Sequence, residues 1–192
     1  MRAARRSCWA AILAHGRAWL VAPRPDLATL DRLLGLMQQR LTLMREVARW
    51  KWNAGQPVMD AERERELLHS VVERGRGKGL DADLVRSFFA AQMEAARLVQ
   101  QADLDRWKAT KQEPFADTKS LVVLRQRIDQ LNSELIDALT ELRPWLWGQT
   151  VQQALPQRAE EILTGNGLAA GARGCCAYAC ARVTFFHGDR IL

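Results

Sequence analysis

The stretch LATLDRLLGLMQQRLTLMREVARWKW, residues 27–52, carries the strongest structural signal in the chain. Its apolar residues recur every three or four positions, which is typical of a long amphipathic helix. Asp26 is the expected N-cap, because it follows Pro23 and Pro25 and precedes the first periodic residue. The turn-forming sequence NAGQP at residues 53–57 is expected to end the helix.

Two cations interrupt the apolar stripe of this helix. Arg40 and Lys51 are eleven residues apart, which is close to three helical turns, so both point the same way about 16 Å apart along the axis. Met44 and Val47 lie between them on the same face. Because burying an unpaired charge is very costly, we expect an anionic group to lie between Arg40 and Lys51.

The rest of the chain repeats the helical period and contains no convincing strand pattern. Further helices are expected from Asp60 to the glycine run 75–79, from Asp81 or Asp83 to about residue 108, and over about 120–142 and 149–163. Pro144 is expected to end the fourth helix. The pattern predicts an all-α fold, a single-domain bundle of about five to six helices.

The length of 192 residues suits one domain, which we predict to span residues 26–165. Residues 1–25 begin with a basic segment and continue into a short apolar run that His15-Gly16-Arg17 interrupts. This pattern predicts either a degenerate signal peptide or a disordered extension. The corresponding location is periplasmic or secreted for a working signal peptide, and otherwise cytoplasmic.

Residues 166–192 form an atypical tail that is rich in glycine and cysteine. Cys175, Cys176 and Cys180 together with His187 could supply four zinc ligands. Their spacing is not a standard zinc pattern, however, so no metal site is predicted.

The composition is that of a globular protein, with 48% hydrophobic and 26% charged residues. The formal net charge of +6 favours an anionic partner, whether nucleic acid, a membrane surface or an acidic small molecule. No run of 18 or more apolar residues occurs, so a transmembrane helix is not expected.

Other predicted helices also carry polar side chains at their apolar stripes. Arg63 precedes Leu67 by one turn, Gln100 follows Ala96, and Arg125 lies just before Ile128. A single arginine at a stripe edge usually extends its charged end into water. Five hydrogen-bond donors from four helices instead predict a pocket for a small polyanion, since guanidinium groups bind carboxylates with paired hydrogen bonds.

The sequence contains few other signs of a catalytic site. No Ser-His-Asp or Cys-His set, P-loop or dinucleotide fingerprint is present. The only acids that the pattern places near the four cations are Asp60 and Glu64. The predicted site therefore offers charge and hydrogen-bond donors, without a nucleophile or a metal.

Four segments resemble the chorismate mutases of the all-helical AroQ type, and best of all their gamma, secreted or periplasmic, subclass. They are QRLTLMREVARWKW at 39–52, PVMDAERE at 57–64, QMEAARLVQ at 92–100 and LRQRIDQLN at 124–132. The resemblance spans about residues 27–142 and extends more loosely to about residue 163. The segment with Arg125 comes last, as it does in the gamma enzymes, where each monomer completes its own site.

The resemblance implies an isomerase that converts chorismate to prephenate in the shikimate pathway, on the route to aromatic amino acids. It implies no cofactor and no metal, and a homodimer. The alternative is a basic helical module that binds nucleic acid or protein and has no catalytic activity.

Residue roles also follow from the resemblance. Arg40 and Arg125 would bind the two substrate carboxylates, and Arg63 would help to orient the carboxylate end. Lys51 would contact a carboxylate and the ether oxygen, to which Gln100 would also donate.

Two acids and one departure from the family pattern complete the predicted site. Glu64, with the backbone near Asp60, would hold the ring hydroxyl. Ala96 occupies a position where the family usually has Ser or Thr, so one hydroxyl contact to a carboxylate is missing. We expect this change to weaken substrate binding without removing the chemistry.

Overall fold

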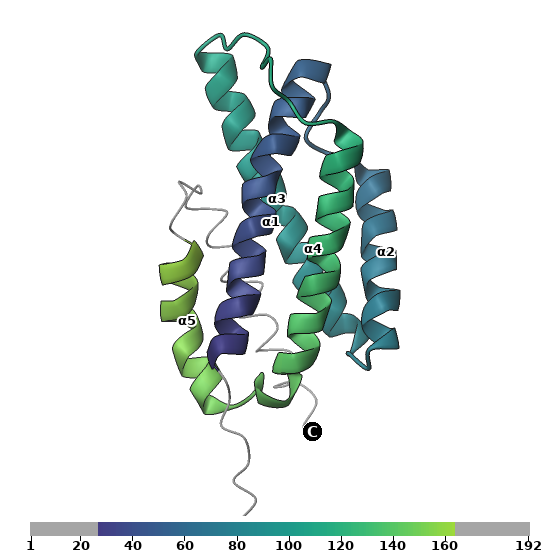
Figure 1. The fold of residues 1–192 in the computed structure, drawn as a ribbon, viewed down its shortest axis with the longest axis vertical. Coiled ribbons are helices and arrows are strands. Elements are labelled where there is room, and N and C mark those ends of the chain that lie inside the picture. Colours follow the sequence, from purple (N-terminus) through teal and green to yellow (C-terminus); the bar gives the residue numbers. More distant parts are fainter. Residues whose placement is uncertain (1–26, 164–192) are drawn as a thin grey trace, which may run out of the picture.

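The computed structural model describes residues 27–163, and every regular element in this range is a helix (Figure 1). The order is α1 (Leu27–Ala54), α2 (Ala61–Gly77), α3 (Ala82–Ala109), α4 (Leu121–Leu142), a 3₁₀ turn (Arg143–Trp145) and α5 (Gln149–Leu163). The predicted all-α bundle is confirmed.

Helix α1 is the centre of the bundle. It packs against α3, α4 and α5, while α2 packs against α3 and α4. In Figure 1, α5 and α4 flank α1 on opposite sides. Fully buried side chains such as Leu34, Leu41, Phe88 and Leu135 join these helices into one core. The interhelical packing therefore fixes the face of α1 that carries Arg40 and Lys51.

Side-chain caps set where three of the helices begin. The Asp60 carboxylate accepts the Arg63 amide at 3.1 Å, and the Asp81 carboxylate accepts the Asp83 and Leu84 amides. Ser120 caps α4. Each cap satisfies amides that have no partner inside the helix. Of the two starts considered for the third helix, Asp81 is therefore the cap.

The glycine run 75–79 ends α2 later than its first glycine would predict. The helix continues through Gly75 to Gly77. A Cβ atom at Gly75 would lie 2.6 Å from Cγ2 of the buried Val85. Gly75 therefore permits the close approach of α2 and α3, and Gly79, with a φ of +76°, supplies the turn between them.

The described helices fall within the predicted domain 26–165. The predicted signal or extension at 1–25, the tail at 166–192, the Asp26 cap and all four cysteines lie outside the described residues. None of the helices in 27–163 combines the length and the apolar character that a membrane span requires.

Candidate functional site

Helices α1 to α4 surround a cleft that is partly open to solvent. Every residue that the sequence nominated for the site lines this cleft: Arg40, Lys51, Asp60, Arg63, Glu64, Ala96, Gln100 and Arg125.

The helical period explains why these side chains converge. Along α1, residues 40, 44, 47 and 51 line the cleft, and α2 contributes residues 63, 64 and 67 from its first two turns. Steps of three or four residues keep side chains on one face of a helix. The apolar members of the same faces, such as Met44 and Leu67, form the dry walls between the charges.

The cleft is strongly positive. Its lining includes five cations and two carboxylates, namely Arg40, Lys51, Arg63, Arg97, Arg125, Asp60 and Glu64. Such an excess in a partly enclosed cleft attracts a small anion that carries more than one negative charge. Arg97 is a lining residue that the sequence analysis did not identify.

Arg40 is buried at the inner end of the α1 stripe, with 2% of its surface exposed. Its Nε donates to Oδ1 of Asn132 on α4 at 3.2 Å, and its Nη1 donates to the Gln92 carbonyl of α3 at 3.1 Å. These two acceptors fix the plane of the guanidinium group. Asn132 and Gln92 therefore position Arg40, a role that the sequence analysis missed.

Lys51 lies half-buried near the other end of the stripe. Its Nζ donates to the Val58 carbonyl at 2.5 Å, which ties it to the turn between α1 and α2. Burial lowers the pKa of Lys51 below 10.5; Asp60 and Glu64 oppose this shift, and Arg125 adds to it. An anion bound beside Lys51 would favour its charged form.

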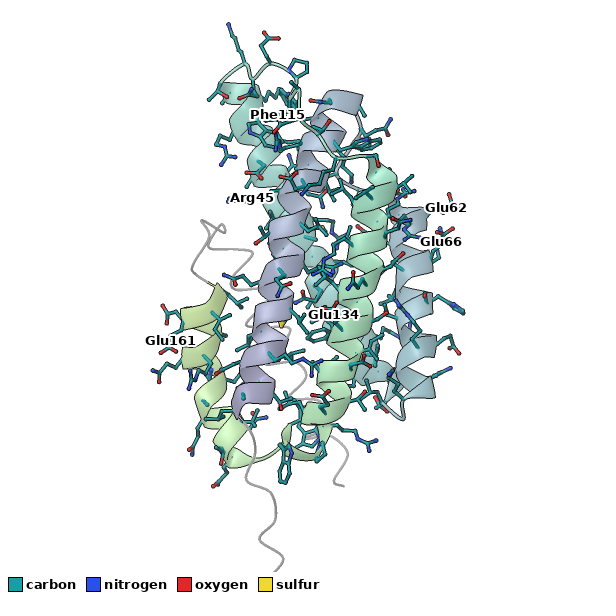
Figure 2. The ribbon with its side chains drawn as sticks, viewed as in Figure 1. Arg45, Glu62, Glu66, Phe115, Glu134 and Glu161 are labelled. Carbon is teal, nitrogen blue, oxygen red and sulfur yellow. The ribbon has the colours of Figure 1, made fainter. Side chains whose placement is uncertain are left out.

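Arg63 turns toward acids that the sequence analysis did not consider. Its guanidinium group lies 3.5 Å from Glu66 and 3.6 Å from Asp129. Glu66 lies on the outer side of α2, as Figure 2 shows. The expectation that Asp60 and Glu64 were the only nearby acids was therefore wrong, because α4 brings Asp129 to α2.

Gln100 is buried, with 5% of its surface exposed, on the α3 wall. Its Nε2 donates to the Ala96 carbonyl at 3.1 Å and lies 3.8 Å from Sδ of Met44. Its Oε1 has no hydrogen-bond partner among the described residues. A buried amide oxygen without a partner is costly, so the amide group has reason to reorient when a ligand enters.

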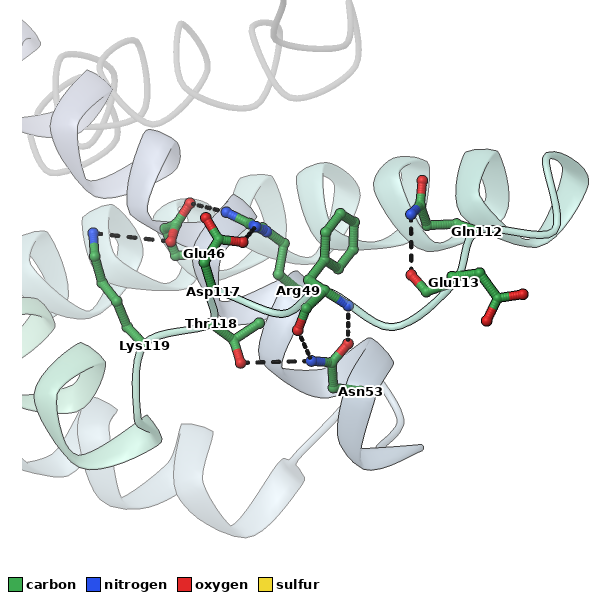
Figure 3. A network of polar contacts seen from close by, with 9 residues as sticks. Glu46, Arg49, Asn53, Gln112, Glu113, Asp117, Thr118 and Lys119 are labelled. Carbon is green, nitrogen blue, oxygen red and sulfur yellow. Dashed lines mark hydrogen bonds and ion pairs between the residues drawn. The ribbon is translucent and has the colours of Figure 1, made fainter.

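Arg125 projects from the second turn of α4, and it forms no hydrogen bond or ion pair with other residues in 27–163. The loop before α4 holds that helix in place (Figure 3). Asn53 donates to the Phe115 carbonyl at 2.7 Å and accepts its amide at 2.9 Å, while Arg49 stacks on the Phe115 ring. The end of α1 thus helps to position Arg125, whose guanidinium group is available to a ligand.

The described residues contain no group of three or more His, Cys, Asp or Glu side chains arranged to hold a metal ion. His69 is exposed on α2 and does not line the cleft. The groups in the cleft can bind anions and donate hydrogen bonds, and the buried walls limit the access of water.

Comparisons with known proteins agree on one family. The family model described as "Chorismate mutase type II" matches residues 26–101. The secreted chorismate mutase of Mycolicibacterium smegmatis is 25% identical over 146 residues, which cover 76% of this chain and 81% of that protein. A bifunctional chorismate mutase/prephenate dehydratase of Enterobacter agglomerans is 36% identical over 88 residues, 45% of this chain and 23% of the relative.

Solved structures have the same arrangement of helices. The crystal structure of the chorismate mutase from Burkholderia thailandensis superposes with a TM-score of 0.72 at 29% identity. The superposition covers 81% of this chain and 99% of that structure. The secreted chorismate mutase of Yersinia pestis, at 19% identity and a TM-score of 0.67, supports the fold.

Proposed function

The chain belongs to the type II chorismate mutase family, and from this membership we propose how its cleft converts chorismate to prephenate. The observation that carries the proposal is the convergence of Arg40, Lys51, Gln100 and Arg125 on one positive cleft. Chorismate is a dianion, so an excess of cations over carboxylates suits its two negative charges.

The reaction is a unimolecular rearrangement in which a carbon–oxygen bond breaks while a carbon–carbon bond forms. No proton is transferred and no covalent intermediate with the protein is needed. The protein can therefore accelerate it by holding the flexible substrate in its compact reactive conformation and by stabilising negative charge that develops on the ether oxygen. A nucleophile would add nothing to either effect.

The conformational restraint is assigned to two arginines that line the cleft from different helices, Arg40 on α1 and Arg125 on α4. Arg40, which lines the cleft and is positioned by Asn132 and the Gln92 carbonyl, would bind one carboxylate. Arg125 would bind the other, with Arg63 helping to orient the carboxylate end. Binding both ends of the substrate lowers the entropy cost of reaching the transition state.

Charge stabilisation is assigned to Lys51 and Gln100. Lys51 would contact a carboxylate and the ether oxygen, and the Gln100 amide would turn its Nε2 toward the same oxygen. Because the walls are apolar, these donors act in a partly desolvated site, where electrostatic interactions are strong. Glu64 and the backbone at Asp60 would accept the ring hydroxyl.

The direct test is to add chorismate to the purified protein and follow its ultraviolet absorbance. We expect its loss to be much faster than in buffer, with prephenate as the product. A folded, helical protein that leaves the buffer rate unchanged would contradict the proposal. The alternative of a non-catalytic nucleic-acid or protein-interaction module finds no support among the relatives, which are named as chorismate mutases.

Gln100→Glu is expected to make activity depend on acid pH. A glutamine can donate at any pH, so wild-type activity should be flat from mildly acidic to neutral pH. A glutamate donates only when protonated, and above its pKa the active fraction falls about tenfold per pH unit. We expect the variant to retain activity near pH 5 and to lose it towards pH 7, measured as kcat/KM.

Gln130→Glu is the matched control, because Gln130 is exposed on α4 and does not line the cleft. This control should keep the flat profile of the wild type. A Gln100→Glu variant with an equally flat profile would remove Gln100 from the group of donors.

We propose that the protein is exported. Relatives named as secreted chorismate mutases occur in Mycolicibacterium smegmatis, Mycobacterium tuberculosis and Yersinia pestis. The basic and then apolar sequence of residues 1–25 also resembles an export signal. Sequencing the N-terminus of protein recovered from the periplasm or the medium would test this, since export by a cleaved signal predicts a start after residue 1.

We also propose a homodimer in which each chain holds a complete cleft. The support is the resemblance to the gamma subclass, together with the origin of all four cleft walls in one chain. One chain has a mass of 21.7 kDa, and light scattering should give twice that value. A mass that stays at one chain over a wide concentration range would exclude the dimer.

A further inference from the structure

We propose that Arg97 is a positioning residue, which holds the Glu64 carboxylate on the α2–α3 side of the cleft and keeps the Lys51 ammonium group available to the substrate. The inference rests on the proposed function. It assigns a role to a residue that neither the sequence motifs nor the family resemblance selected.

The contacts of Arg97 place it between two acids. Its Nη1 donates to Oε2 of Glu64 on α2 at 3.2 Å, and its Nη2 donates to Glu94 one turn earlier on α3. The side chains of Arg97 and Glu64 are 32% and 26% exposed, so their ion pair is partly shielded from water. Arg97 thus bridges α3 to the first turn of α2 at the edge of the cleft.

Glu64 also interacts electrostatically with a second cation, Lys51. It acts on Lys51 electrostatically, yet Lys51 forms no ion pair with any carboxylate of the described residues and bonds to the Val58 carbonyl instead. Arg97 competes with Lys51 for the same carboxylate. Because a guanidinium group bound to Glu64 offsets its charge, Glu64 is less able to draw the ammonium group away from a ligand.

The charge around Lys51 comes from three neighbouring helices. The charged groups that share its cleft are Asp60, Arg63 and Glu64 on or next to α2, Arg97 on α3, Arg125 on α4, and Arg40 on its own helix. Of the two acids, Asp60 is engaged as the cap of α2. Glu64 is therefore the carboxylate whose position depends most on Arg97.

A double-mutant cycle separates this role from direct binding of the substrate by Arg97. The four proteins are the wild type, Arg97→Ala, Glu64→Gln and the double variant. If Arg97 acts through Glu64, the loss caused by Arg97→Ala must shrink when Glu64 carries no charge. If Arg97 binds a substrate carboxylate itself, the loss must be equal in both backgrounds.

We expect Arg97→Ala to lower kcat by about tenfold in the wild-type background and by less than about twofold in the Glu64→Gln background. Arg97→Lys should recover most of the activity, since an ammonium group can still pair with Glu64. Arg106→Ala is the matched control on α3, because Arg106 pairs with Asp103 away from the cleft and should leave kcat unchanged. Equal losses in both backgrounds, or no loss at all, would overturn the inference.

The pKa of Lys51 gives a readout that does not depend on turnover. Release of Glu64 should raise this pKa, because a freed carboxylate stabilises the ammonium form. Titration of Lys51 by NMR should therefore show a higher pKa in Arg97→Ala than in the wild type. The same substitution in the Glu64→Gln background should produce a much smaller rise.

The two possible failures are distinguishable. A wild-type protein that does not consume chorismate would contradict the proposed function, while the NMR cycle would still report whether Arg97 controls Glu64. An active wild type whose Lys51 pKa rises by the same amount in both backgrounds would leave the function standing and exclude the control of Glu64 by Arg97.

Discussion

Lys51→Ala is expected to lower kcat by about 10²–10³-fold, the usual cost of losing one preorganised donor to a developing oxyanion. Lys51 is the only ammonium group in the cleft of the described chain. Its one described hydrogen bond is to the Val58 carbonyl near the surface, so the melting temperature should change little. Stopped assays of chorismate consumption, with melting curves on the same samples, measure both effects.

Two variants separate charge from packing at this position. Lys51→Met keeps the apolar stem against the cleft wall and should be as inactive as Lys51→Ala. Lys108→Ala removes an exposed lysine of α3 outside the cleft and should have wild-type kcat. Near-normal turnover in Lys51→Met would show that the ammonium group is not needed.

The assignment of Lys51 as a charged donor also predicts how activity falls at alkaline pH. Burial lowers the pKa of Lys51 below 10.5, and the charged form is the active one. Activity should therefore be full below that pKa and fall as the pH rises through it. The midpoint for kcat/KM, which reports the free enzyme, should lie below that for kcat, since the bound dianion favours the ammonium form.

Arg40→Ala is expected to lower kcat/KM by about 10²–10⁴-fold, because two charge-assisted hydrogen bonds to one substrate carboxylate are lost at about 1.5–3 kcal/mol each. Unlike Lys51, Arg40 is buried, and it supplies donors to Asn132 and to the Gln92 carbonyl. We therefore expect a lower melting temperature as well, by several degrees.

Activity must be measured well below the melting temperature of the variant, so that lost folding is not read as lost catalysis. Arg40→Lys keeps the charge without the planar pair of donors, and it should recover little kcat/KM. Arg86→Ala, at an exposed arginine of α3 outside the cleft, is the matched control and should match the wild type. Full activity in Arg40→Ala would refute the assignment.

The helices were predictable because their signals are local. Asp60, Asp81 and Ser120 cap their own helices through amides two or three residues away. Buried apolar residues recur from Leu30 to Ala48 in α1 and from Leu124 to Leu142 in α4. The end of α2 was less predictable. The role of Gly75 depends on Val85, which only the packing of α3 brings near.

The site was predictable where its residues interrupt an apolar stripe, as Arg40, Lys51 and Gln100 do. The partners of those residues were not. Asn132 is 92 positions from Arg40, and Glu64 is 33 positions from Arg97. No local pattern links such pairs, since their contact depends on how the helices pack. Whether the nominated residues carry the chemistry is a question for the variants above.

Among the described residues, helices α1 to α4 of one polypeptide line the cleft, with α1 in the middle and α4 supplying the last arginine, and we propose that each chain holds such a complete cleft. A defect in any one of these helices therefore cannot be made good by a neighbouring molecule that carries an intact copy of that helix. In a mixture of intact and defective chains, each chain would be active or inactive according to its own sequence.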